Sequence, residues 1–161
     1  MAACVAGQPD IAARALGAPI PADLIGPRSA LTYSSAQLDA DPAYAPWSTR
    51  AILLADTPLI VGYVRFHERP DAARLHPFGG HAAELGYSVF PDHRRRGYAG
   101  EAVDALMDWA TASHGITRFV VSIAPDNAAS SALAARRGFQ RIGEQMDEVD
   151  GLEHVFLRET R

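Results

Sequence analysis

The fold of this chain is decided at a basic turn that reads Pro91-Asp92-His93-Arg94-Arg95-Arg96-Gly97-Tyr98-Ala99-Gly100. The residues before it, 84–90, favour an extended strand. After it, apolar residues recur at helical spacing and predict a helix over 99–113. The turn therefore joins the end of a strand to the N-terminus of a helix.

This turn has the properties of an anion-binding site. The first N–H groups of a helix have no partner within the helix, and the helix dipole is positive at this end. Gly97 would let an anionic group approach the backbone closely, and the run 94–96 adds three arginines. We expect phosphate to bind here, to the backbone and to at least one arginine. The alternative is a solvated cluster in which one arginine pairs with Asp92 or Glu101.

The composition is that of one globular domain. With 161 residues and 48% hydrophobic content, the chain can bury one sizeable core, so we expect a single domain over 1–161. The formal net charge of -4 argues against a general nucleic-acid binder, which would need a basic surface. A small anionic ligand fits one local basic cluster better.

Cysteine usage and hydropathy bear on location. The single cysteine, Cys4, cannot form an internal disulfide. The sequence contains no apolar run long enough to cross a bilayer, and its N-terminus lacks the basic and apolar regions of a secretory signal. We therefore expect a cytoplasmic protein with no membrane partner.

The part before the turn predicts two helices followed by a hairpin. Gly7 and Pro9 weaken the first helix. The expected helices cover 2–16 and 29–38, the strands 50–55 and 59–67, and the irregular stretches 17–28 and 68–81. We expect the two irregular stretches and the region of Trp47 to form a pocket.

The part after the turn predicts strand, helix and hairpin in that order. Alternating apolar residues indicate a strand over 117–123. A helix capped near Asn127 should stop at Gly138. The segments 139–146 and 152–158 bracket Asp150-Gly151, a strong hairpin signal. The whole order indicates a mixed α/β sheet.

Several of these motifs together resemble the GNAT acetyltransferase superfamily over residues 47–158. The family pattern of Gln or Arg, two residues, Gly, one residue, Gly or Ala is matched by Arg94-Arg95-Arg96-Gly97-Tyr98-Ala99. Supporting positions are Val61-Gly62, Glu84, the run 126–130, and Arg137-Gly138-Phe139. Gly-Tyr-Ala and Asn-x-x-Ser resemble most the branch that contains N-terminal acetyltransferases of ribosomal proteins.

The resemblance implies a fold and a reaction. The fold would be an α/β (α+β) one, with a mixed, mostly antiparallel central sheet flanked by helices. The reaction would transfer an acetyl group from acetyl-CoA to a primary amine, either a peptide N-terminus or a small molecule, by direct attack in a ternary complex. No metal is implied.

The resemblance also implies which residues bind the donor. The pyrophosphate of coenzyme A would lie on the backbone around 95–99, and the Val89 N–H would stabilise the thioester oxygen. Asn127 would contact the pantetheine arm, and Ser130 would lie near the sulfur. The full expected set is Tyr87, Ser88, Val89, Arg94, Arg95, Arg96, Gly97, Tyr98, Ala99, Gly100, Asn127 and Ser130.

Two departures from the family pattern stand out. The family opens with a strand before its first helix, whereas this sequence begins within the expected helix, so either Met1 is not the natural start or the sheet lacks that edge strand. A sheet without it would leave an edge at which a homodimer could form. Many relatives also carry a tyrosine general acid where this sequence has Ala134.

Two residues are candidates for proton transfer. Acetyl transfer needs a neutral amine, and Glu84 is the candidate base, directly or through water. Its alternative role is that of a solvated or salt-bridged strand carboxylate. Ser130 could donate a proton or a hydrogen bond to the departing thiolate; its alternative is local hydrogen bonding in the first turn of the helix.

The rival interpretation is a coenzyme A-binding sensor or scaffold that has lost turnover. Glu84 favours the enzyme, and the missing tyrosine favours the rival. A nucleic-acid module that uses the arginine run is a third possibility that the acidic net charge disfavours. The histidines at 67, 76, 81 and 93 fit no zinc spacing, so we expect no metal site.

Overall fold

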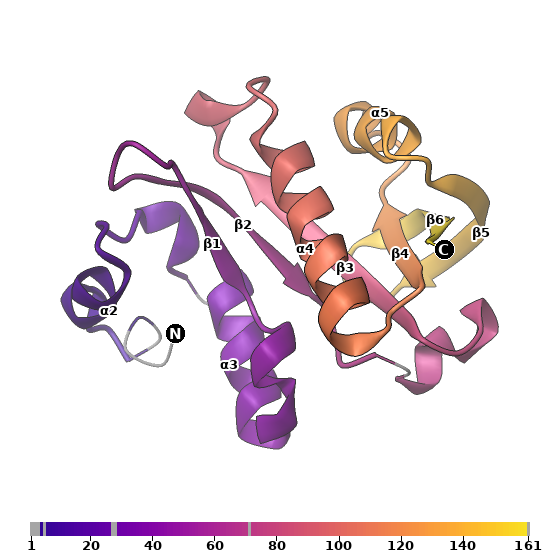
Figure 1. Ribbon diagram of the computed structural model, residues 1–161, viewed down its shortest axis with the longest axis horizontal. Coiled ribbons are helices and arrows are strands. Elements are labelled where there is room, and N and C mark those ends of the chain that lie inside the picture. Colours follow the sequence, from indigo (N-terminus) through magenta and orange to yellow (C-terminus); the bar gives the residue numbers. More distant parts are fainter. Residues whose placement is uncertain (1–3, 5, 27–28, 71, 161) are drawn as a thin grey trace. The chain divides into compact units, whose positions relative to one another are not determined.

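A computed structural model describes residues 4, 6–26, 29–70 and 72–160. Its chain divides into two compact units. Unit 1 comprises Met1–Phe66 and Tyr87–Ala102, and unit 2 comprises His67–Gly86 and Val103–Arg161. The strands form a six-stranded sheet in the order β1-β2-β3-β4-β6-β5. The mixed, mostly antiparallel sheet with helices that the sequence predicts is confirmed (Figure 1).

Unit 1 begins with two helices, α2 (Pro9–Leu16) and α3 (Ala30–Ala40). The expected helix over 2–16 is wrong at Gly7, which lies in the left-handed region with φ 72° and breaks the helix before Pro9 starts α2. Residues 2, 3 and 5 of that expectation lie outside the described residues. The predicted second helix is confirmed, and the Ser29 hydroxyl caps it by accepting from the Thr32 N–H at 3.2 Å.

The hairpin of unit 1 follows a buried aromatic turn. A 3-10 helix over Pro42–Trp47 places Tyr44 and Trp47 in the core. The Tyr44 hydroxyl donates to the Phe66 carbonyl oxygen at 2.6 Å, and the Trp47 ring packs edge-on to Phe66 with ring centroids 5.2 Å apart. These contacts fix the end of the predicted hairpin, which is confirmed as β1 (Arg50–Leu53) paired antiparallel with β2 (Ile60–Phe66).

No described residue before Arg50 belongs to a strand, so β1 is the first strand and lies at one edge of the sheet. The stretch 17–28 is not fully irregular, since it holds a 3-10 turn over Ala22–Leu24. Leu24 is buried there with Ala18, Ile60 and Phe90, which explains why the segment folds back onto the strands.

Strand β3 (Ala82–Val89) and helix α4 (Tyr98–His114) each contribute residues to both units. They are the predicted strand and helix on either side of the basic turn. Helix α4 ends where Gly115 adopts φ 68° and donates its N–H to the Thr111 oxygen at 3.0 Å.

Unit 2 contains the remaining strands, β4 (Arg118–Ile123), β5 (Gln140–Asp147) and β6 (Gly151–Glu159), and helix α5 (Ala128–Arg136). Strand β4 runs parallel to β3 and antiparallel to β6, and β5 pairs antiparallel with β6. The predicted strand, helix and hairpin are confirmed.

The β5–β6 turn is held by one carboxylate. Asp147 Oδ1 accepts from the N–H groups of Val149 at 2.7 Å and Asp150 at 2.9 Å. These two backbone hydrogen bonds lower the pKa of Asp147. Gly151 then enters β6 with φ 79°, a conformation that favours glycine.

The stretch 68–81 is not structureless. Within its described residues a 3-10 helix covers Ala73–Phe78, because Leu75 is buried at 1% exposure and anchors the segment. Residue 71 lies outside the described residues. Among the helices that the structure describes, none is both long and apolar enough to span a membrane.

Candidate functional site

The basic turn in unit 1 has the geometry that its sequence predicts. Strand β3 ends at Val89, a 3-10 turn covers Pro91–His93, and α4 starts at Tyr98. Gly97 has φ 90° and Arg95 has φ 64°, so two of the four residues between these helices are in the left-handed region. Turns that contain left-handed residues are one setting in which backbone N–H groups form anion-binding nests.

The three arginines of the turn are exposed. Arg94 Nε donates to the Val89 carbonyl oxygen at 2.9 Å, and Arg96 Nη2 donates to the Asp92 carbonyl oxygen at 3.4 Å. Within the described part of the chain, no ion pair joins these arginines to the carboxylates of Asp92 or Glu101. The arginine charges are therefore available to a ligand.

The end of β3 is pressed against β2 within unit 1. The Phe90 N–H donates to the Val61 carbonyl oxygen at 2.9 Å. A Cβ atom at Gly62 would overlap Ser88 O and lie 3.0 Å from Val89 Cα. Gly62 therefore permits a backbone approach that a larger residue would prevent, and it determines where the Val89 backbone lies.

The other residues of unit 1 that are expected to bind the acetyl donor surround this junction. Tyr87 and Ser88 are half-buried, as are Tyr98 and Ala99, while Gly100 is buried at the start of α4. The structure thus brings the residues of 87–100 together in one strand, turn and helix.

If this turn binds coenzyme A, as the resemblance implies, we expect its backbone to contribute more to the affinity than the Arg95 side chain does. Arg95→Gly relieves a left-handed backbone that costs a non-glycine residue about 1 kcal/mol, and it keeps every N–H group. The affinity for coenzyme A, measured by titration calorimetry, should fall by no more than about threefold, while Arg96→Ala serves as the matched charge removal. A tenfold or larger loss in Arg95→Gly alone would show that its guanidinium is the main contact.

Glu84 in unit 2 is a buried, hydrogen-bonded carboxylate. It is 2% exposed and lies at the last parallel pair between β3 and β4, opposite Val120. Oε1 accepts from the Ser122 hydroxyl at 2.6 Å, and Oε2 forms an ion pair with Arg74 Nη1. The salt-bridged state that the sequence left open is therefore present, and it leaves the catalytic role untested.

Arg74 lies between two carboxylates. Its Nε is 2.9 Å from Glu68 Oε2, while its Nη1 holds Glu84. Partial burial disfavours the charged guanidinium, but the attraction and hydrogen bonds of Glu84 and Glu68 outweigh it and raise the pKa of Arg74. Arg74 thus remains charged, and it balances the buried charge of Glu84.

A network of hydrogen-bonded polar side chains continues from Glu84 across the sheet. Gln145 Nε2 donates to Ser122 Oγ at 3.0 Å and to Glu153 Oε2 at 3.1 Å. Burial raises the pKa of Glu153; the hydrogen bond from Gln145 opposes this shift, and the negative charge of Glu84 adds to it. Four side chains from β3, β4, β5 and β6 therefore form one connected network.

The sequence reasoning missed Ser122, Gln145, Glu153 and Arg74. They lie far apart along the chain and form no motif. Strand register alone could have found Gln145 and Glu153, because they are directly opposite each other in the predicted hairpin.

Asn127 and Ser130 occupy the N-terminus of α5 in unit 2. Asn127 Oδ1 accepts from the Ser130 N–H at 3.1 Å, so Asn127 is the N-cap that the sequence predicts. Asn127 is exposed and Ser130 is half-buried. Ala134, at the position of the expected tyrosine, is buried at 1% exposure.

Because Asn127 caps α5, its contribution to stability can be measured without a ligand. Asn127→Ala should cost about 1 kcal/mol of unfolding free energy, because the Ser130 N–H loses its partner. Asn127→Asp should keep the cap and the stability in chemical denaturation. If Asn127 also contacts coenzyme A through its amide, both variants should weaken coenzyme binding, whereas a purely structural role predicts a loss in neither once the folded fraction is matched.

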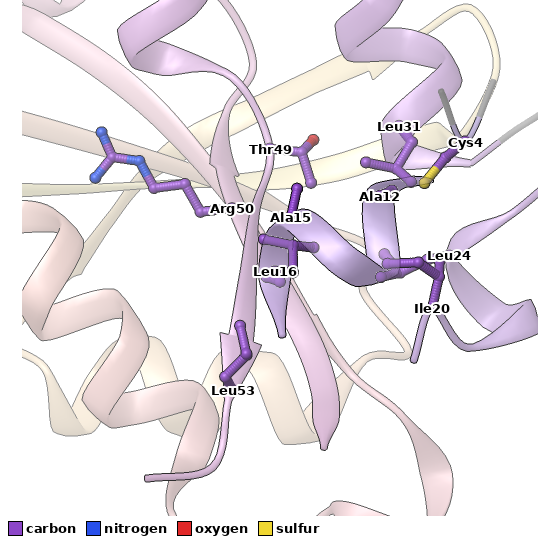
Figure 2. A pocket seen from close by; sticks show the side chains of 11 residues that line it. Cys4, Ala12, Ala15, Leu16, Ile20, Leu24, Leu31, Thr49, Arg50 and Leu53 are labelled. Atoms are coloured by element: carbon purple, nitrogen blue, oxygen red, sulfur yellow. The ribbon is translucent and has the colours of Figure 1, made fainter. Parts of the chain in front are cut away.

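Unit 1 also holds an apolar cavity of about 450 Å³. Figure 2 shows side chains from α2, from Ile20 and Leu24, from Leu31 of α3 and from β1 around it, with Thr49 and Arg50 as its polar members. Cys4 lines it as a free, buried thiol. Of the regions expected to form an acceptor pocket, the stretch 17–28 contributes to this cavity, whereas Trp47 is buried in the core and 68–81 belongs to unit 2.

No group of three His, Cys, Asp or Glu side chains that could hold a metal ion occurs among the residues that the structure describes.

The strand, turn and helix around Gly97 can be compared with known proteins. Residues 2–140 match the family model described as the acetyltransferase (GNAT) domain. This chain belongs to the GNAT acetyltransferase family.

Curated and solved relatives agree with that family. The uncharacterised N-acetyltransferase YoaA of Bacillus subtilis is 31% identical over 88 residues, which cover 55% of this chain and 46% of YoaA. The chain spans about half the length of the curated relatives it matches. Coordinates of the ribosomal-protein-S5-alanine acetyltransferase from Vibrio fischeri superpose with a TM-score of 0.62 at 20% identity, over 77% of this chain and 67% of that one. This GNAT chain therefore shares the fold of a ribosomal-protein acetyltransferase.

The structure of a further relative contains the acetyl donor, acetyl-CoA. The microcin C7 self-immunity acetyltransferase MccE was solved with acetyl-CoA and AMP. It is 26% identical to this GNAT chain with a TM-score of 0.53, over 63% of this chain and 55% of that one.

Proposed function

We propose that this GNAT protein transfers an acetyl group from acetyl-CoA to a primary amine by direct attack in a ternary complex. The observation that carries the proposal is the turn of 94–97, which leads from β3 into α4 with Gly97 at φ 90° and with three exposed arginines. The family membership and the acetyl-CoA bound to MccE support it. The amine is a peptide N-terminus or a small molecule.

The donor is held by both backbone and side chains in this proposal. The backbone of 95–99 and at least one arginine bind the pyrophosphate. The Val89 N–H stabilises the developing thioester oxyanion, a contact worth about 3 kcal/mol when such donors are preorganised. Asn127 contacts the pantetheine arm, and Ser130 donates a hydrogen bond or a proton toward the leaving sulfur.

Glu84 is the proton acceptor in this proposal. An amine near pKa 10.4 is mostly protonated at neutral pH, so transfer needs a base. Because Glu84 is 2% exposed, we propose that it acts through a water molecule that lies between the carboxylate and the ammonium. The thiolate, with a thiol pKa of about 8.5 by analogy with cysteine, can leave without a strong acid.

A sensor that binds coenzyme A without turnover is the second candidate. It is favoured by Ala134, which is buried where many relatives carry a tyrosine acid. The buried carboxylate of Glu84 favours the enzyme, since burying a charge without a function brings no advantage in stability over an apolar side chain.

Two measurements on the wild-type protein separate these candidates. Calorimetry with coenzyme A tests binding, and release of free thiol from acetyl-CoA with a panel of peptides and small amines tests transfer. The enzyme predicts acceptor-dependent thiol release and an acetylated amine in mass spectrometry. Binding without release for any acceptor supports the sensor, and absence of both overturns the proposal.

Several expectations from the sequence stay predictions. They are a single domain over 1–161, a homodimer, a cytoplasmic location, and the lack of nucleic-acid and membrane partners.

A further inference from the structure

We propose that Ser122 and Gln145 are positioning residues that orient the carboxylate of Glu84, and that Glu153 sets their orientation. The inference rests on the proposed function, in which Glu84 is the proton acceptor.

Strand register explains why these side chains meet. Glu84 pairs with Val120 at the end of the β3–β4 ladder, and Ser122 is the next residue of β4 on the same face. Ser122 lies opposite Val155 of β6, two residues from Glu153. Glu153 in turn lies opposite Gln145 of β5. Alternation therefore places all four polar side chains on one face of unit 2.

Each hydrogen bond in this network of side chains has a defined donor and a defined acceptor. An ionised carboxylate can only accept, so Glu153 requires the Gln145 amide to present its nitrogen, at 3.1 Å from Oε2. The same nitrogen donates its second hydrogen to Ser122 Oγ at 3.0 Å. Because Ser122 Oγ already accepts that hydrogen, its own hydroxyl hydrogen points to Glu84 Oε1 at 2.6 Å. Glu153 thus determines, through two side chains, that Ser122 donates to Glu84.

Each carboxylate oxygen of Glu84 is held by a different partner. Ser122 donates to Oε1 and Arg74 pairs with Oε2, while Glu68 holds Arg74 in turn. A carboxylate held at both oxygens cannot rotate, yet each oxygen has a second lone pair that can accept a proton from water. The network therefore fixes the direction in which Glu84 accepts a proton without occupying all of its acceptor capacity.

A structural role for the same network makes a different prediction. If the network merely ties the β5–β6 hairpin to β4, loss of its hydrogen bonds should lower the free energy of unfolding and leave the chemistry of the folded protein unchanged. If it positions Glu84, its loss should lower kcat in a way that depends on Glu84.

The decisive experiment is a cycle of Ser122→Ala, Glu84→Gln and the double variant, with kcat and both KM values measured from pH 6 to pH 10. We expect Ser122→Ala to lower kcat about tenfold, with the KM for acetyl-CoA within about twofold of wild type. In the Glu84→Gln background the same substitution should change kcat less than about twofold.

Three further variants test whether misfolding explains the loss of kcat. Ser122→Thr keeps the hydroxyl on a β-branched side chain suited to a strand and should restore most of kcat. Gln145→Ala should reproduce the loss, while Glu144→Ala, on the neighbouring exposed position of β5, should not. Thermal unfolding of each variant identifies the temperature at which all are folded.

Equal losses from Ser122→Ala in both backgrounds, or an unchanged kcat in Ser122→Ala and Gln145→Ala, would overturn the inference and leave the proposed function standing. Absence of acetyl transfer by the wild-type protein, with every amine tried, would instead overturn the proposed function and the inference with it.

Discussion

Glu84→Gln is expected to lower kcat about 100-fold near pH 7, the lower end of what a general base contributes. The substitution keeps the size of the side chain and removes its ability to take up a proton. The loss should be greatest at low pH, where nearly all of the amine is protonated, and should shrink as pH rises toward the pKa of the amine. Steady-state thiol release from acetyl-CoA across pH 6 to 10 measures this.

The control for this variant is Glu144→Gln, which neutralises an exposed carboxylate on β5 and should leave the profile unchanged. Glu84→Gln turns an amide nitrogen or a neutral oxygen toward Arg74, so its melting temperature must be recorded and the assay run where it is folded. A pH–rate profile equal to that of wild type would remove Glu84 from the proton transfer.

Gly62→Ala is expected to impair both stability and transfer. The new Cβ would overlap Ser88 O and lie 3.0 Å from Val89 Cα, and both are backbone atoms that cannot rotate away. Separating the two segments should cost about 2 kcal/mol, as overpacking does in other cores. The shift would also displace the Val89 N–H, and loss of an oxyanion donor lowers kcat by about 100-fold or more.

Chemical denaturation and kcat with a saturating amine measure the two effects. Gly143→Ala is the matched control, because Gly143 also lies in a strand and a Cβ there would meet no atom within 4 Å. If Gly62→Ala loses stability but keeps kcat at a temperature where it is folded, the Val89 backbone does not stabilise the transition state.

Local patterns predicted most of the secondary structure. Helical spacing located α4, the signals at Asn127 and Gly138 bounded α5, and Asp150-Gly151 located the β5–β6 hairpin. These features depend on neighbours within a few residues, so a short window of sequence contains their physical cause. The turn at 94–97 belongs to the same class, because glycine conformation and helix ends are local properties.

Two of the predictions that were wrong concern segments whose structure depends on distant contacts. The stretch 68–81 forms a 3-10 helix where Leu75 becomes buried. The stretch 17–28 contains a 3-10 turn that packs Leu24 against Ile60 and Phe90. Neither segment has a periodic pattern, because a short turn needs a single buried anchor rather than a repeating apolar face.

The sequence by itself determined the order of elements, the turn at Gly97 that leads into α4, and the membership of the GNAT family. Tertiary structure alone decided the surroundings of Glu84. Arg74 reaches it from a 3-10 helix and Ser122 reaches it from β4. Gln145 of β5 and Glu153 of β6 join it through Ser122, by hydrogen bonds of 3.0 and 3.1 Å. A hydrogen bond exists only when its two atoms meet, and strand pairing brings Glu84 and Ser122 together across 38 positions of sequence.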